Sequence, residues 1–152
     1  MKILVMSDSH GMKNAMLGVV SHESPDMILH LGDSDKDCSV LKLEYPDIPL
    51  RTVRGNCDRS SDGLDIDEFV LCGKRFIMTH GDKFHVKTGL SAITDYATAR
   101  GADILLFGHT HSQHFSTKDN MTIINPGCIL GIKEYAVLTL ENGVVACDLK
   151  EL

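Results

Sequence analysis

The stretch LLFGHTHSQH, residues 105–114, joins an apolar run to three of the eight histidines of this chain. The apolar run, residues 103–107, has the length and character of a buried β-strand, and the polar residues begin where that strand would end. Histidines two positions apart on an extended backbone point to the same side, so His109 and His111 are predicted to reach toward one place. That arrangement suits a metal site if other parts of the chain bring further ligands there.

Four other apolar runs of the sequence also end in polar residues beside a glycine. These runs are residues 2–7, 27–31, 50–54 and 75–79, and they are followed in turn by Asp8 with His10, by Asp33, by Asn56 and by His80. In parallel sheets, ligands bind outside the carboxyl ends of the strands. The sequence therefore predicts that strand ends deliver two carboxylates, one amide and four imidazoles to one edge of a sheet.

Each of these residues has an ordinary explanation when it is taken alone. Asp33 or Asn56 beside a glycine is typical of a turn or a helix cap, and a lone His80 is more often a core or surface residue. Separate strand ends that all carry ligand chemistry are harder to assign to turn preference. Seven nitrogen and oxygen ligands are too many for one tetrahedral zinc ion but suffice for two neighbouring metals, with one of Asp8 or Asp33 shared. Without a thiolate among them, Mn, Fe, Zn or Ni is favoured over copper(I) or an iron–sulfur cluster.

Length and composition predict a single domain, residues 1–152, in the cytoplasm. A chain of 152 residues with 43% hydrophobic and 24% charged residues is ordinary for a globular protein with one core. The formal charge of −6 argues against general nucleic-acid binding. The first apolar run is too short for a signal peptide, and no run approaches the ~20 apolar residues that span a membrane. The five cysteines form no C-x-x-C motif, which argues against a disulfide framework.

The order of the remaining elements predicts an α/β fold. Helical spacing predicts helices over residues 12–22, 38–45 and 90–100. Further strands are expected over residues 66–71, 121–124, 134–140 and 144–149. Hairpin turns are predicted at residues 72–74 and at Asn142-Gly143, a dipeptide typical of tight turns. Strand and helix therefore alternate first, as in a parallel sheet, and antiparallel strands are added later.

These residues, in this order, resemble the calcineurin-like metallophosphoesterase family. The pattern of that family is D-x-H, G-D, G-N-H-[DE], a histidine often next to glycine, and G-H-x-H, and the match runs from Asp8 to His111. The small size and the sequence G-N-C-D at residues 55–58 look like the compact bacterial and archaeal phosphodiesterase subfamily. The resemblance implies an α/β fold in which a two-sheet sandwich of mixed β-strands is flanked by helices, as a four-layer sandwich.

The resemblance also implies a ligand set and a reaction. It implies that Asp8, His10 and His111 hold one metal ion, that Asn56, His80 and His109 hold a second, and that Asp33 bridges the two. The implied cofactors are two divalent ions, manganese first, with Ni, Fe, Zn or Co as alternatives. The implied reaction is hydrolysis of a small phosphate ester, foremost a phosphodiester, by in-line attack of a metal-bridging hydroxide.

Two positions depart from the family pattern. Cys57 stands where the wider family has the histidine thought to protonate the leaving group, and Asp82 stands where many small members have a second histidine. The first departure puts general-acid catalysis in doubt. Asn56, Cys57 and Asp58 are nevertheless the candidate catalytic residues, and Asp58 is expected either to orient a neighbouring ligand or to cap a turn.

Other polar residues are expected to lie outside the site, and other functions remain open. His30, within the run 27–31, is predicted to be a core histidine with satisfied hydrogen bonds, whereas Arg54 and Arg59 are predicted to be solvated. A phosphomonoesterase or nucleotidase would use the same site. A non-catalytic interaction scaffold of the same fold, like a retromer subunit, is a further alternative, which the complete ligand set disfavours. Association of identical chains is left open.

Overall fold

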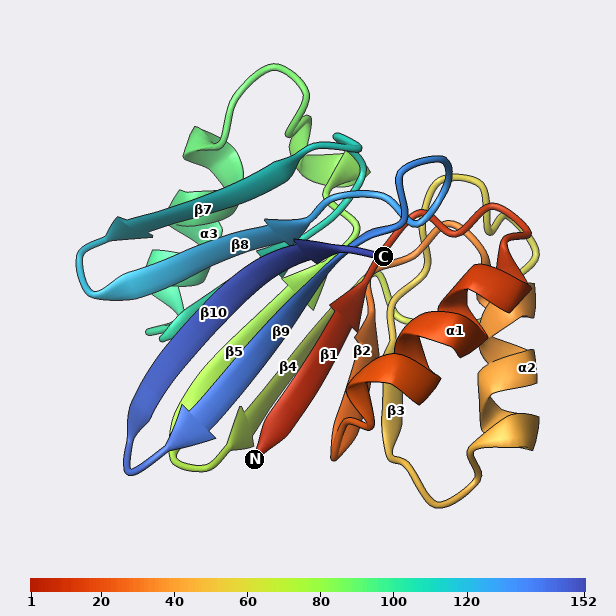
Figure 1. Ribbon diagram of the computed structural model, residues 1–152. Helices are drawn as coiled ribbons and strands as arrows, with labels where there is room; N and C mark the ends of the chain where they lie inside the picture. The colour runs from red at the N-terminus through yellow and green to blue at the C-terminus, as the bar shows by residue number, and fades with distance from the viewer.

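The architecture is a sandwich of two mixed five-stranded sheets with helices on both outer faces (Figure 1). The computed structural model describes residues 1–152, apart from the side chain of Asp35. Strands follow the order β10-β9-β1-β2-β3 in the first sheet and β4-β5-β6-β8-β7 in the second. The predicted fold class, a two-sheet sandwich of mixed strands flanked by helices, is therefore confirmed.

The first sheet is built from both ends of the chain. It contains β1 (Lys2–Met6), β2 (Met27–His30), β3 (Leu50–Thr52), β9 (Glu134–Glu141) and β10 (Val144–Glu151). The strands β1, β2 and β3 are parallel, and β9 pairs antiparallel with β1 on its other side. The tight turn between β9 and β10 has Asn142 at φ 51° and Gly143 at φ 78°, as a two-residue hairpin turn requires. The predicted late hairpin is thus present, but it extends the first sheet.

The second sheet contains one strand that the sequence did not predict. Its strands are β4 (Ile66–Leu71), β5 (Lys74–Thr79), β6 (Ile104–Phe107), β8 (Met121–Pro126) and β7 (Gln113–Lys118). The strands β5, β6 and β8 are parallel, whereas β4 and β7 pair antiparallel at the two edges. The unpredicted strand is β7, whose sequence QHFSTK has no apolar run because it lies at the edge with Phe115 exposed.

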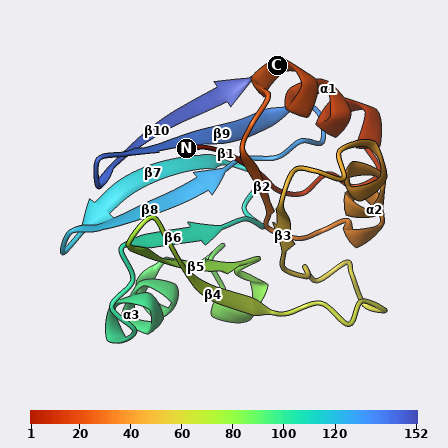
Figure 2. The ribbon, with the colours of Figure 1, turned by 90° about the horizontal axis from the view of Figure 1, so that it is seen from below.

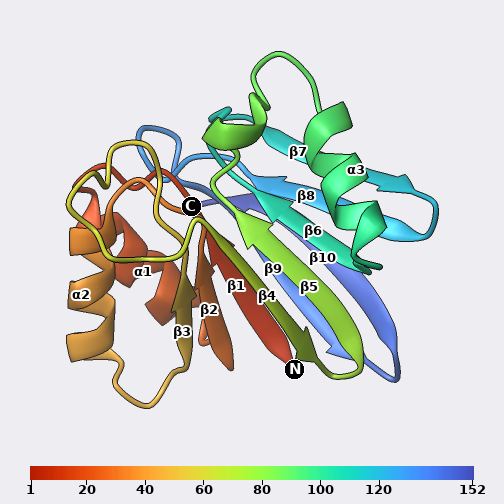
Figure 3. The ribbon, with the colours of Figure 1, turned by 180° about the vertical axis from the view of Figure 1, so that it is seen from behind.

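The helices cover the two outer faces of the sandwich. They are α1 (Lys13–Glu23), α2 (Asp35–Glu44) and α3 (Ser91–Ala99), and a 3₁₀ turn, η1 (Asp82–Phe84), precedes α3. Figure 2 and Figure 3 show α1 and α2 against the first sheet and α3 against the second. The helix α2 begins three residues before the predicted start at residue 38. None of the helices in the described part of the chain combines the length and apolar character needed to cross a membrane.

Both faces of the central strands are buried, which explains their continuous apolar sequences. In β1, Ile3 and Val5 belong to the core between the sheets, while Leu4 and Met6 pack against α1 and α2. A third apolar cluster joins α3 to β5 and β6, with Ile93 among its buried residues. Full burial of one such side chain contributes roughly 1.5–3 kcal/mol, so the three apolar layers hold the strand ends in place.

A buried ion network ties the two ends of the chain together. Glu23, at the end of α1, is 4% exposed and accepts hydrogen bonds from the Tyr135 hydroxyl at 2.9 Å and from Lys150 Nζ at 3.0 Å. Its other oxygen lies 2.7 Å from Lys2 Nζ. Burial alone would raise the pKa of Glu23, but the hydrogen bonds from Lys2, Lys150 and Tyr135 outweigh it and lower this pKa to about 2. The network therefore connects α1 with β1, β9 and β10.

We expect Glu23→Gln to lower the free energy of unfolding by about 1–3 kcal/mol near neutral pH, because two ammonium groups lose a charged acceptor. The folded pKa of Glu23 lies below its ordinary value of 4.5, so its stabilising effect is present above that value and disappears as the pH falls toward about 2. Urea unfolding of wild type and variant across this pH range measures the difference. The exposed Glu44→Gln is the control, and a loss that persists unchanged at the acid end contradicts the assignment.

Candidate metal centre

Loops at the carboxyl ends of five strands converge at one end of the sandwich, the upper end in Figure 1. These strands are β1, β2 and β3 of the first sheet and β5 and β6 of the second. The sequence predicted one sheet edge; the structure instead joins the ends of two packed sheets. Two groups of candidate ligands result, Asp8 with His10 and His111, and Asp33 with His80 and His109, and in each group the ligand atoms lie within 4.8 Å of one another.

The first group surrounds a carboxylate oxygen that has no hydrogen bond. Asp8 Oδ1 lies 3.0 Å from His111 Nε2 and 3.8 Å from His10 Nε2, yet it is buried and without a hydrogen-bond partner among the described residues. The other oxygen, Oδ2, accepts hydrogen bonds from Ser7 Oγ and from the backbone N–H of His109. Leaving a buried carboxylate oxygen unpaired is costly. A cation between this oxygen and the two imidazoles would satisfy it, so the donor set fits a metal ion.

The second group is arranged around His80. Its Nε2 lies 3.1 Å from Asn56 Oδ1, 3.1 Å from His109 Nδ1 and 3.4 Å from Asp33 Oδ2. Its Nδ1 lies 2.8 Å from the carbonyl oxygen of Leu31, which can only accept a hydrogen bond. The proton of a neutral His80 therefore sits on Nδ1, and the lone pair of Nε2 points toward the other candidate ligands. Asn56, His80, His109 and Asp33 meet as the sequence predicted.

Asp33 lies between the two groups. One of its oxygens, Oδ2, is 3.7 Å from His10 Nε2 and 3.4 Å from His80 Nε2, while Oδ1 accepts the backbone N–H of Cys57 at 2.8 Å. Burial alone would raise the pKa of Asp33, but the contacts with His80 and with the Cys57 N–H hold that pKa well below its usual range. Burial would likewise lower the pKa of His80, whereas Asp33 and Asp8 raise it. Both shifts show carboxylates that favour a positive charge beside them.

Five of the candidate ligands have left-handed backbone conformations, which non-glycine residues seldom adopt. They are Asp8 (φ 55°), His10 (φ 43°), Asp33 (φ 56°), His109 (φ 67°) and His111 (φ 55°). The prediction that His109 and His111 reach toward one place is wrong for this reason. Their backbone is not extended, and the two imidazoles diverge, His109 into the second group and His111 into the first.

Glycines allow the loops to approach the ligands closely. A Cβ atom on Gly55 would overlap the side chain of Asp33, and one on Gly108 would overlap Ser7 Oγ beside Asp8. Because these positions leave no room for a side chain, the two loops can pack directly against the carboxylates. Ser7 was not among the predicted site residues, because a serine that only fixes a neighbouring carboxylate has no sequence pattern.

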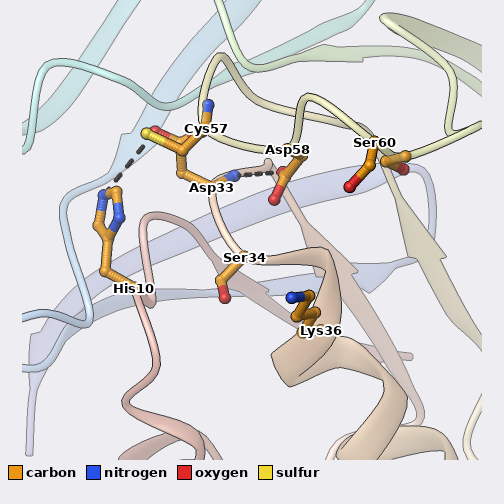
Figure 4. A pocket seen from close by; sticks show the side chains of 8 residues that line it. His10, Asp33, Ser34, Lys36, Cys57, Asp58 and Ser60 are labelled. Atoms are coloured by element: carbon orange, nitrogen blue, oxygen red, sulfur yellow. Dashed lines mark hydrogen bonds and ion pairs between the residues drawn. The ribbon is translucent and has the colours of Figure 1, made fainter.

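Asp58 holds the loops that carry the second group of ligands. Its Oδ2 accepts the backbone N–H of Asp33 at 2.9 Å and that of Gly55 at 2.8 Å, and Figure 4 shows Asp58 beside Asp33. Of the two roles left open for Asp58, the geometry supports orientation of a neighbouring ligand. Cys57 is exposed, and its Sγ accepts a hydrogen bond from Asn56 Nδ2 at 3.4 Å. Burial of the sulfur, Asp33 and Asp58 raise the pKa of the Cys57 thiol.

The remaining polar residues lie outside the two groups. Arg54 pairs with Asp65 through two hydrogen bonds, of 2.6 and 3.2 Å, and Arg59 is exposed. His30 is fully buried, but only its Nδ1 is satisfied, by the N–H of Gly32 at 3.3 Å. Its Nε2 has no hydrogen-bond partner within the described residues, so the prediction of a satisfied histidine is half wrong. Burial lowers the pKa of His30 to about 4, which leaves it neutral.

Comparisons with known proteins agree with this geometry. The probable metallophosphoesterase YsnB of Bacillus subtilis is 33% identical over 149 residues, which cover 93% of this chain and 86% of that protein. A phosphodiesterase of Methanocaldococcus jannaschii is 26% identical over 165 residues, covering 93% of this chain and 95% of that protein.

The crystal structure of Vps29 from Entamoeba histolytica complexed with zinc has a TM-score of 0.79 at 17% identity, covering 99% of each chain, and this likeness concerns the fold alone. The model of the calcineurin-like phosphoesterase superfamily domain matches residues 1–143, nearly the whole chain. With its fold, its candidate metal ligands and these matches in agreement, the chain belongs to the calcineurin-like phosphoesterase superfamily.

Proposed function

We propose that this protein is a phosphodiesterase that uses two divalent metal ions to hydrolyse a small phosphate diester. The observation that carries the proposal is Asp8 Oδ1, buried without a hydrogen bond between two imidazoles, next to a second ligand group that meets the first at Asp33. Membership of the superfamily supports hydrolysis of a phosphate ester, and the named phosphodiesterase among the relatives supports a diester.

The proposed ligands divide the site between two ions, manganese first among the candidates. Asp8, His10 and His111 hold one ion, Asn56, His80 and His109 hold the other, and Asp33 bridges them. When bound, the ions would lower the pKa of the attacking water and offset the charge of the phosphoryl oxygens. An all nitrogen and oxygen donor set is compatible with Mn, and equally with Ni, Fe, Zn or Co.

The residues of the chain prepare this chemistry in the absence of a protein nucleophile. Asp33, held ionised by its contacts, supplies negative charge for the cations. Leu31 fixes the tautomer of His80, and Asp58 fixes the backbone of Asp33. The side chain of His111 is 43% exposed, so a phosphate group can reach the site from solvent. A small phosphate ester therefore suits the open side of the centre.

Protonation of the leaving group is the weak step of this proposed mechanism. Cys57 occupies the position of the expected acid, and its side chain lies within reach of His10 and Asp33. The same surroundings that raise its pKa keep it a thiol, which in ordinary peptides has a pKa of ~8.5. A thiol held by an amide hydrogen bond is poorly suited to donate a proton to an alkoxide. A phosphomonoesterase with the same centre is the alternative, and a cytoplasmic location stays part of the proposal.

The first test is removal of metal. We expect hydrolysis of an aryl phosphodiester to vanish after exhaustive chelation and to return with added Mn, because no protein side chain in the site replaces the cations. Assays of the stripped protein with Mn, Ni, Co, Zn and Mg, on diesters and monoesters in parallel, also separate the phosphodiesterase from the monoesterase. Undiminished turnover by protein shown to be metal-free sinks the proposal.

The second test is metal stoichiometry in site variants. We expect Asp33→Asn to weaken both ions, because the shared oxygen loses its charge, whereas His111→Ala should weaken mainly one. The exposed His85→Ala is the matched control and should keep both ions. Elemental analysis after equilibrium dialysis gives the number of ions per chain. An Asp33→Asn protein that retains two tightly bound ions shows that Asp33 does not bridge.

The third test concerns Cys57. Because a poorly placed acid matters little for nitrophenolate but greatly for an alkoxide, we expect kcat/KM of the wild type to fall steeply as the leaving-group pKa rises. Positioned general acids contribute ~10²–10⁴-fold, so Cys57→Ser should change the aryl diester rate by less than about tenfold. Cys57→His should accelerate poor leaving groups more than good ones. A flat wild-type series, or a collapse of the aryl rate in Cys57→Ser, means that Cys57 is a working acid.

A further inference from the structure

A cavity of about 400 Å³ opens beside the candidate metal centre and extends away from it over the start of α2 (Figure 4). Its inner wall consists of residues already placed at the centre, namely His10, Asp33, Cys57 and Asp58. Its outer wall consists of Ser34, Lys36, Ser60 and Ser61, none of which has a part in the proposed chemistry. The outer wall is therefore the surface that an ester group of the substrate would meet.

The outer wall is polar throughout. Ser34 and Lys36 come from the start of α2, and Ser60 and Ser61 come from the loop between β3 and β4. The wall thus offers three hydroxyl groups and one ammonium group, with no aromatic or aliphatic side chain on which a nucleobase could stack. A volume in this range accommodates a ligand of several polar groups. These features suit a small polyol better than a nucleoside.

Lys36 is the cation of this cavity. It lines the wall and has no ion pair or hydrogen bond in the part of the structure that is described. The nearby basic side chains are already engaged, since Arg54 and Lys83 both pair with Asp65. In Figure 4 the Lys36 side chain lies at the far end of the cavity from His10. A substrate phosphate held at the metal centre would thus leave Lys36 to a second anionic group.

We propose that the cavity binds one alcohol group of the diester and that Lys36 recognises a second phosphate on it, so that the preferred substrates are diesters of a phosphorylated polyol. The inference rests on the proposed function, because the carboxylates of Asp33 and Asp58 repel an anion unless bound cations offset them. The serine hydroxyls contact the hydroxyls of the polyol. Lys36 is then a residue that determines specificity and leaves the chemical step unchanged.

The kinetic test compares two diesters with the same 4-nitrophenol leaving group, one carrying glycerol and the other carrying glycerol with a second phosphate. We expect the manganese-loaded wild type to show the lower KM for the phosphorylated compound. Lys36→Gln should raise that KM about three- to tenfold and leave the KM for the glycerol compound within about twofold, with kcat unchanged. Lys42→Gln, an equal charge change on the exposed face of α2 outside the cavity, should alter neither.

An equilibrium measurement separates this inference from the proposed function. Calorimetric titration of the manganese-loaded protein with glycerol 1,3-bisphosphate and with glycerol 3-phosphate needs no turnover. Tighter binding of the bisphosphate that is lost in Lys36→Gln supports the cavity assignment even if no diester is hydrolysed, an outcome that would sink only the phosphodiesterase. If diesters are hydrolysed but Lys36→Gln affects both substrates equally, or neither, Lys36 does not read a second anion and the inference is wrong.

Discussion

The structure depends on the buried carboxylate of Asp8. One of its oxygens is held by Ser7 and by the backbone N–H of His109, while the other faces two imidazoles without a hydrogen bond. Asp8 follows a strand of the first sheet, and His109 follows a strand of the second, so their contact joins the sheets at the end where the ligands gather. Burying an ionised carboxylate costs several kcal/mol unless it is compensated, and this contact compensates only half of it.

Backbone strain at the site has the same physical meaning. Left-handed conformations at Asp8, Asp33 and His111 each cost on the order of 1–3 kcal/mol and persist only when the surrounding structure imposes them. The three apolar layers impose them here, because the strand ends cannot move without opening the core. Gly55 and Gly108 let the loops close against the carboxylates. Ligand positions are thereby set by the sandwich before a cation arrives.

Sequence alone predicted the elements and ligands whose signals are local. The buried runs of β1 and β6 are continuously apolar, and Asn142-Gly143 specifies its own turn. Other features depend on distant partners. The edge strand β7 is held by its pairing with β8 and has no apolar pattern of its own, and the division into two sheets follows from strand order that no local signal contains. The divergence of His109 from His111 follows from backbone angles, and Lys36 in sequence is one more exposed lysine.

Two kinds of buried carboxylate in this protein distinguish its structural parts from its functional part. Glu23 is compensated by the ammonium groups of Lys2 and Lys150, which are permanent and leave the carboxylate no role but to hold the chain ends. Asp8 and Asp33 face only imidazoles and backbone donors among the described residues, with no lysine or arginine paired to them. Imidazoles are neutral metal ligands near neutral pH, so they leave the carboxylate charge to an exchangeable cation. The chain thus fixes charge where it needs rigidity and leaves charge open where it needs chemistry.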